Sequence, residues 1–101
     1  MSGELHHKDF APCVHDKFQV TGEHTGRFSL ELIQISEEKS TPQEESFSLV
    51  FRGPADRSIP QQIHKLKHHR LGDLDVFLVP IGHDKEGYYY QAVFNHLTPS
   101  A

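Results

Sequence analysis

The chain has 101 residues, which is enough for one domain and hardly enough for two. Hydrophobic residues make up 36% of it and aromatic residues 10%, which excludes a chain that is disordered throughout. Ten lysines and arginines against fourteen acidic residues give a net charge of -4, which argues against nucleic acid as a partner because phosphates need a basic face.

The first 15 residues are expected to form a short N-terminal arm. Ser2 can cap a helix there, and Pro12 limits that helix because a proline pushes the preceding residue out of the helical region. The arm lacks the apolar stretch of a signal peptide. The whole sequence has no run approaching the roughly 18 apolar residues of a membrane span, so no membrane partner is expected.

From residue 16 onward the pattern changes to a period of two, which is typical of strands. Phe18 and Val20 form the first short alternation, and residues 22–26, with a glycine at either end, predict a turn. Phe28–Leu32 alternates in the same way, but the isoleucines that follow fall on the opposite parity. A change of face within one strand predicts a bulge or a strong bend.

The middle of the chain reads as a polar loop followed by two more strands. Ser36–Ser46 holds four glutamates and one proline and is expected to be a solvated loop. Phe47–Arg52 alternates again, and Gly53-Pro54 ends that strand. Ile63–Leu71 fits either a helix face or a strand. We prefer the strand, because Leu71-Gly72-Asp73 supplies a turn into a clear partner strand.

That partner strand, Leu74–Ile81, alternates at its start and is apolar on both faces at its end, where Phe77, Val79 and Ile81 join. Burial of both faces predicts that something covers the outer one, either the N-terminal arm or a second subunit. Tyr88–Phe94 forms the last alternating strand.

Six strands with short polar connections predict an all-β fold, a small antiparallel six-stranded barrel or curled sandwich with a short N-terminal helical arm. We expect a single domain over residues 1–101, with the arm at 1–15, the β core at 16–95 and a tail at 96–101. Closure into a barrel would remove the strand edges that an open sheet must protect.

Short segments spread over nearly the whole chain form a combined pattern: Asp9-Phe10-Ala11-Pro12 with Phe18 downstream, Phe47-Ser48-Leu49-Val50-Phe51-Arg52-Gly53-Pro54, Pro60-Gln61, His68 before Leu71-Gly72, Phe77-Leu78-Val79-Pro80 and Tyr90-Gln91-Ala92-Val93-Phe94-Asn95. Together they resemble a family of small uncharacterised bacterial β-domains, a domain of unknown function of about this length. The resemblance implies a bacterial, mostly β domain whose relatives lie near phage-tail-like genes, and it transfers no catalytic residue.

The chain departs from that family in one turn. Where relatives tend to have glycine before Phe18, this chain has His15-Asp16. Aspartate tolerates the left-handed conformation better than most residues, so the turn is expected to survive with some strain.

The histidines His64, His68 and His69 are the candidate metal ligands. On a helix, His64 and His68 would lie one turn apart and could share a zinc ion. On a strand they are about 13 Å apart and cannot bind one ion together. With the strand preferred, we expect solvated histidines; zinc is the alternative, and its further ligand would come from His96, His83 or Asp75.

The sequence gives little support for a catalytic nucleophile or for a catalytic pair of carboxylates. Cys13 is the single cysteine, which excludes an internal disulfide and indicates a reducing compartment, the cytoplasm. With His15 and Asp16 it has the residue types of a Cys-His-Asp set, but such close neighbours seldom align for catalysis. Asp73 and Asp75 share the polar face of one strand and are interpreted as solvated charges. We predict no catalytic residue.

Tyr89 is expected to point away from the core and to lie beside Phe77, Val79 and Ile81. Such a group either packs under the N-terminal arm or forms an exposed apolar patch of the kind that marks an interface, with Arg52 and the 36–46 loop at its rim.

These observations favour a non-enzymatic protein-binding or assembly module of bacterial or phage-derived origin, with a protein partner or a homo-oligomeric state. The alternative is a histidine-dependent metal or small-ligand binding protein.

Overall fold

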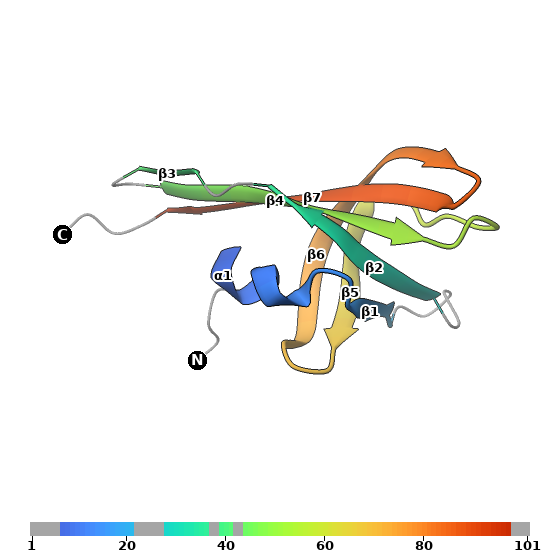
Figure 1. Ribbon diagram of the computed structural model, residues 1–101, viewed down its shortest axis with the longest axis horizontal. Coiled ribbons are helices and arrows are strands. Elements are labelled where there is room, and N and C mark those ends of the chain that lie inside the picture. Colours follow the sequence, from blue (N-terminus) through green and yellow to red (C-terminus); the bar gives the residue numbers. More distant parts are fainter. Residues whose placement is uncertain (1–6, 22–27, 37–38, 42–43, 98–101) are drawn as a thin grey trace.

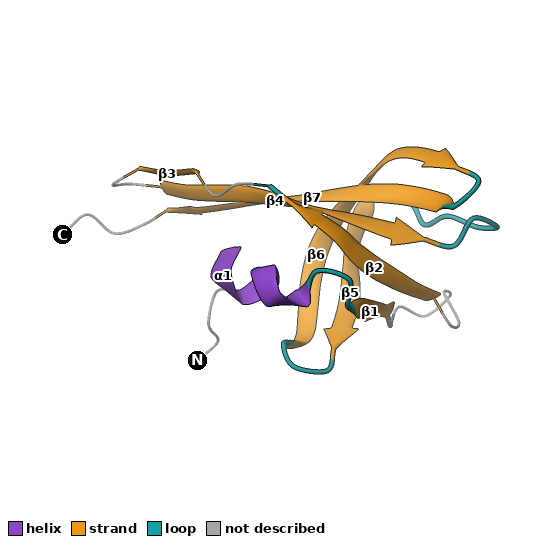
Figure 2. Cartoon of the chain, viewed as in Figure 1, coloured by secondary structure: helices purple, strands orange, loops and turns teal. Residues whose placement is uncertain are grey.

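The computed structural model of the chain describes residues 7–21, 28–36, 39–41 and 44–97. Strands dominate it, and the helical part is confined to the N-terminal arm (Figures 1 and 2). The elements in chain order are α1 (His7–Phe10), the 3-10 helix η1 (Ala11–Cys13), β1 (Lys17–Val20), β2 (Phe28–Ile35), β3 (Lys39–Thr41), β4 (Glu44–Gly53), β5 (Gln62–His68), β6 (Gly72–Asp84) and β7 (Gly87–Leu97).

Six of these strands close into an antiparallel barrel. The order across the sheet is β2-β1-β5-β6-β7-β4-β3, and β2 also pairs with β4, which joins the two ends into a ring. The short β3 lies outside that ring, on the edge of β4. The all-β prediction and the six-stranded barrel with a short helical arm are therefore confirmed.

The bend in β2 makes this closure possible. The strand pairs with β1 through Lys17↔Glu31 to Val20↔Phe28, and with β4 from Glu31↔Arg52 onward. Its register on β4 shifts between Leu32 and Gln34. The change of parity in the sequence predicted this bulge, and a bulge bends a strand enough to turn it from one neighbour to the other.

Alternation along the strands fills the barrel. β1 alternates exposed and buried residues, and so does β5 from Ile63 onward. The strand reading of Ile63–Leu71 is thus confirmed, with β5 ending at His68. Tyr90 is fully buried inside, and its hydroxyl oxygen accepts a hydrogen bond of 3.1 Å from the backbone N–H of Ile59. The buried apolar residues that the strands contribute are Phe18, Val20, Phe28, Leu30, Leu32, Phe47, Leu49, Phe51, Leu66, Val76, Leu78, Tyr90 and Ala92.

The N-terminal arm packs against the part of β4 and β7 that runs beyond the barrel (Figure 1). The rings of Phe47 and Phe94 stack there with centroids 5.1 Å apart, and Phe10 lies against both, at 6.0 and 5.3 Å. Phe10 is fully buried as a result. None of the helices in the described part of the chain has the length and apolarity to span a membrane.

Two expectations about the arm and the outer face need correction. The arm does not cover Phe77 and Ile81, which stay 49% and 51% exposed. The second apolar face of β6 is therefore open in this chain. The left-handed residue before Phe18 is His15, with φ 78°, rather than Asp16.

The described parts of the polar segment 36–46 include strand residues, which a solvated loop did not predict. Lys39–Thr41 forms β3 and pairs with the start of β4, which begins at Glu44. The last strand continues to Leu97, past the expected end of the core. The predicted Ser2 cap and the predicted turn at residues 22–26 lie outside the described residues.

Candidate functional site

An apolar outer patch, formed by Ile63, Phe77, Val79 and Val93, lies on the outside of the barrel across β5, β6 and β7. Ile63 and Phe77 face each other in register on neighbouring strands, and Ile63 is 63% exposed. Val79 is half-buried and pairs with Gln91, and Val93, also 63% exposed, follows Gln91 on the same face of β7. The patch is thus continuous over three adjacent strands.

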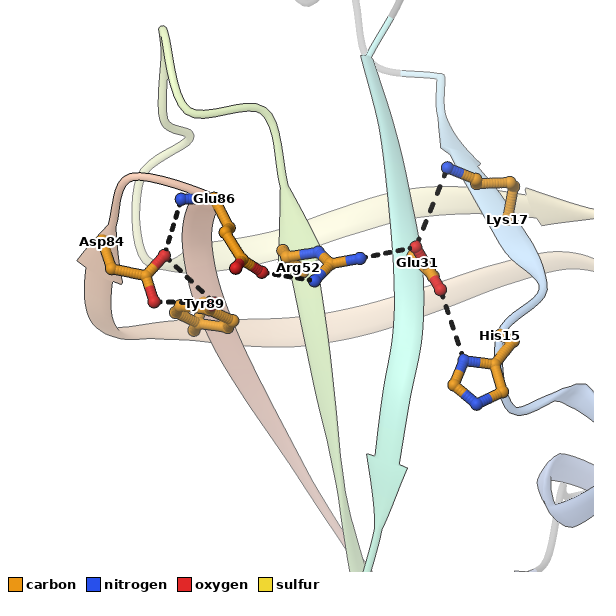
Figure 3. Close-up of polar contacts among 7 residues, drawn as sticks. All are labelled: His15, Lys17, Glu31, Arg52, Asp84, Glu86 and Tyr89. Carbon is orange, nitrogen blue, oxygen red and sulfur yellow. Dashed lines mark hydrogen bonds and ion pairs between the residues drawn. The ribbon is translucent and has the colours of Figure 1, made fainter.

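The predicted interface residues Arg52 and Tyr89 lie opposite each other on the same outer surface. They are register partners on β4 and β7, and Arg52 also faces Glu31 on β2. One guanidinium nitrogen of Arg52 donates to Glu31 at 3.0 Å and another donates to Glu86 at 3.3 Å (Figure 3). Arg52 therefore links the bent strand β2 to the β6–β7 turn.

The Tyr89 hydroxyl is held at the other end of this row. It donates to the two carboxylate oxygens of Asp84 at 3.0 and 3.1 Å, and the backbone N–H of Glu86 donates to Asp84 at 2.8 Å. Figure 3 shows the resulting polar row, which we call the Arg52–Tyr89 network; it consists of Glu31, Arg52, Asp84, Glu86 and Tyr89.

The charges of this network are fixed by its own contacts. Burial raises the pKa of Glu31, but hydrogen bonds from His15 and Arg52 outweigh it, so the pKa lies below the ordinary value. The hydrogen bond to Glu31 raises the pKa of Arg52. A hydrogen bond from the backbone N–H of Glu86 lowers the pKa of Asp84. Burial is the larger cause that raises the pKa of Tyr89, and the hydrogen bond to Asp84 is the second. At neutral pH Arg52, Glu31 and Asp84 are charged, and Tyr89 keeps its proton.

The three predicted zinc ligands do not converge on one point. His64 and His68 lie on the inward face of β5, and both are buried, which corrects the expectation that they are solvated. His64 donates from Nε2 to the carbonyl oxygen of Pro60 at 2.7 Å. His69 is exposed, although its ring lies 4.4 Å from that of His68.

His68 instead joins Cys13 and Asp16, and the ligand atoms of these three residues lie within 4.8 Å of one another. The backbone N–H groups of Arg70 and Leu71 both donate to Nδ1 of His68, each at 3.1 Å. An acceptor at Nδ1 places the ring proton on Nε2, which donates to Asp16 at 2.9 Å. The tautomer of His68 is thereby set.

This tautomer opposes both metal binding and catalysis at the cluster. A metal on Nε2 needs the lone pair there, which would put a proton on Nδ1 facing two backbone N–H groups. The same ring has no free lone pair to take a proton from Cys13, and burial raises the pKa of that thiol. The contacts fit a structural link between the N-terminal arm, the end of β5 and the β5–β6 turn.

Sequence reasoning set aside Cys13, His15 and Asp16 as a catalytic set, and His15 indeed lies apart, paired with Glu31 at 3.3 Å. It missed that His68 reaches Asp16 from 52 residues away. The alternation along β5 could have indicated that His68 is buried, because His68 lies two residues after Leu66 and therefore on the same inward face of the strand.

Comparison with known protein families gives a match over nearly the whole chain. The family described as Domain of unknown function (DUF6916) matches residues 5–94. The chain belongs to this family. The resemblance stated from the sequence is confirmed to that extent, and membership in DUF6916 assigns no activity. A search of curated proteins returns no match to this DUF6916 domain. A search of solved structures returns none either.

Proposed function

We propose that this DUF6916 domain is a non-enzymatic protein-binding module that works as a component or accessory of a larger bacterial or phage-derived assembly. Its contact surface is the apolar outer patch, with the Arg52–Tyr89 network at the rim. The observation that carries the proposal is the face-to-face pair Ile63 and Phe77, 63% and 49% exposed on the outside of a closed barrel. The single cysteine, a buried thiol, suits a reducing compartment and supports a cytoplasmic setting.

The arrangement of these residues matters more than their exposure. Single exposed apolar side chains are common on soluble proteins, but groups that are contiguous over several strands mark interaction surfaces. The outer face of the neighbouring part of β5 and β6 carries Lys65 and Asp75, which pair at 3.3 Å as a solvated surface would. The patch interrupts that polar pattern where Ile63 and Phe77 meet.

The rim supplies residues of the kind that dominate binding energies. Arginine and tyrosine are enriched among the few residues that carry most of the affinity of protein interfaces. Arg52 and Tyr89 are held in place by Glu31, Glu86 and Asp84, so a partner would lose little affinity to ordering them. A different protein is the favoured occupant, and a second copy of the chain is an outcome of the test.

The experiment compares capture of proteins from an extract of the native host by two variants. The double variant Ile63→Thr with Phe77→Thr removes apolar area but keeps residues that strands accept. Gln62→Thr, on the same strand beside Ile63, is the matched control. We expect a defined partner, identified by mass spectrometry, that binds the wild type and the control and is lost from the double variant.

Light scattering of the purified chain separates the two occupants. A monomer that captures a partner through the patch supports the proposal. A wild-type dimer that becomes a monomer in the double variant would show self-association through the patch instead. A monomer whose double variant captures the same proteins as the wild type would overturn the proposal.

A further inference from the structure

A second feature of the outer surface lies on the other side of β5 from the apolar outer patch. An open hollow of about 340 Å³ on the surface is lined by five exposed residues, Lys17, Gln19, Ser29, Lys67 and His69. Gln19 on β1 is the register partner of both Ser29 on β2 and Lys67 on β5, so these three side chains form one row across three strands. We call this feature the cationic cavity.

Every side chain that lines the cationic cavity can donate a hydrogen bond. Lys17 and Lys67 supply ammonium groups, Gln19 an amide and Ser29 a hydroxyl. The ring of His69 lies against that of the buried His68, with centroids 4.4 Å apart and an angle of 33° between the ring planes. No carboxylate is among the lining residues. Such a set is suited to an anion with several acceptor oxygens.

Lys67 is the freer of the two ammonium groups. Lys67 faces Asp73 in register, but no ion pair joins Lys67 to any residue in the described ranges. Lys17 reaches Glu31 only at 3.9 Å, and that carboxylate already binds Arg52 at 3.0 Å and His15 at 3.3 Å. The chain as a whole carries a net charge of -4, so this local excess of positive charge is not a consequence of its composition.

We propose that the cationic cavity binds a small phosphorylated molecule. An anion in the cavity would be attracted by the ammonium groups of Lys17 and Lys67, which line it. Lysine is a common phosphate ligand, and charge-assisted hydrogen bonds are the strong ones. The volume lies at the lower end of the range for small-molecule sites, which leaves room for a phosphate and a few attached atoms. This inference does not depend on the proposed protein partner.

The test uses nuclear magnetic resonance of the full chain with inorganic phosphate and pyrophosphate, at constant ionic strength maintained with sodium chloride. We expect saturable shifts of the amides of Lys17, Gln19, Ser29, Lys67 and His69, with pyrophosphate binding more tightly because it carries more charge. Lys67→Gln should weaken binding by about tenfold, since one charge-assisted contact is lost.

Lys65→Gln is the matched control, because Lys65 lies two residues away on the same face of β5 but binds Asp75 at 3.3 Å. It should leave the affinity unchanged. Shifts that do not saturate, or that Lys67→Gln does not alter, would mean an adventitious ion only and would overturn the proposal. Binding to vesicles containing phosphatidic acid, with no saturable binding of phosphate or pyrophosphate, would assign the cavity to a lipid headgroup and also overturn it.

Discussion

His68 connects segments that are distant in the sequence through one neutral imidazole. Its Nδ1 accepts from the β5–β6 turn and its Nε2 donates to Asp16, which follows the N-terminal arm. The ring also stacks on Phe18 with centroids 4.6 Å apart. A histidine on the inward face of a strand is therefore part of the core here, and its hydrogen bonds explain why the core can hold it.

Removing the His68 ring should lower the free energy of unfolding more than removing the neighbouring His69 ring. His68→Ala leaves two backbone N–H groups without their acceptor and should lower the free energy of unfolding by roughly 3 kcal/mol. His68→Asn, whose side-chain oxygen can take the place of Nδ1, should recover part of that loss. Urea unfolding measures both, with the exposed His69→Ala as control. Equal effects of His68→Ala and His69→Ala would contradict the structural role.

Asp16 should make the protein sensitive to acid. The hydrogen bond from His68 lowers the pKa of Asp16. A carboxyl group with a lower pKa in the folded chain contributes stability above its unfolded pKa of about 3.9, and this contribution is lost as the pH falls through the folded value. Asp16→Asn should therefore lose less stability than the wild type on acidification below about pH 4.

Urea unfolding at a series of acidic pH values measures this difference. Asp56→Asn, in the exposed β4–β5 loop, controls for the change in charge. If Asp16→Asn were as sensitive to acid as the wild type, the contact with His68 would not be the source of the effect.

The tautomer of His68 also makes a prediction about zinc. A metal at Cys13, Asp16 and His68 would have to break the hydrogen bonds to Nδ1, so an equimolar amount of zinc should not raise the melting temperature of the untagged protein. A melting temperature that rises with zinc, and no longer does so in His68→Asn, would contradict the hydrogen-bond pattern described above.

At the scale of elements, the β6–β7 turn is packed closely against the end of β4. A Cβ atom on Gly87 would clash with the carbonyl oxygen of Gly53 and would lie 2.9 Å from Cγ of Arg52. This close approach places the turn, and Glu86 within it, against Arg52. Glycine at position 87 is thus a condition for the Arg52–Tyr89 network.

Gly87→Ala should therefore destabilise the protein by roughly 2 kcal/mol or more, because backbone must move to admit the methyl group. Gly82→Ala is the control, since a Cβ there meets no atom within 4 Å. Thermal unfolding should show a clear decrease in melting temperature for the first variant and little change for the second. Similar melting temperatures would mean that the turn is not packed in this way.

Strand parity predicted the elements well where apolar residues alternate. It located the strands of the barrel and the bulge in β2, where the isoleucines change face. It failed for Lys39–Thr41 and the start of β4, because their strand character comes from backbone pairing rather than from an apolar face. Residue type likewise could not show that His15 rather than Asp16 takes the left-handed conformation.

At the scale of the whole molecule, closure of the barrel follows from one strand that pairs on both sides. β2 pairs with β1 through one part of its length and with β4 through another. A local pattern allows a barrel or a curled sandwich equally, so only the pairing decides between them. The same limit applies to Phe77: its apolar surroundings were visible in the sequence, but not that the N-terminal arm packs on Phe47 and Phe94 instead.

The outer surface consequently carries two separate features on a closed scaffold, the apolar outer patch and the cationic cavity. The interior holds no comparable feature among the described residues, since the buried histidines are both hydrogen-bonded to protein groups. The function proposed above therefore uses the outside of the barrel, with the patch as its main part.

The most direct test of this assignment is site-specific photocrosslinking in the native host. A benzophenone amino acid in place of Phe77 reports what touches the patch, and the same group in place of Gln62 reports on the adjacent position of β5. We predict a covalent adduct with a defined protein at position 77 and none at position 62. No adduct at position 77, or the same adducts at both positions, would contradict the account.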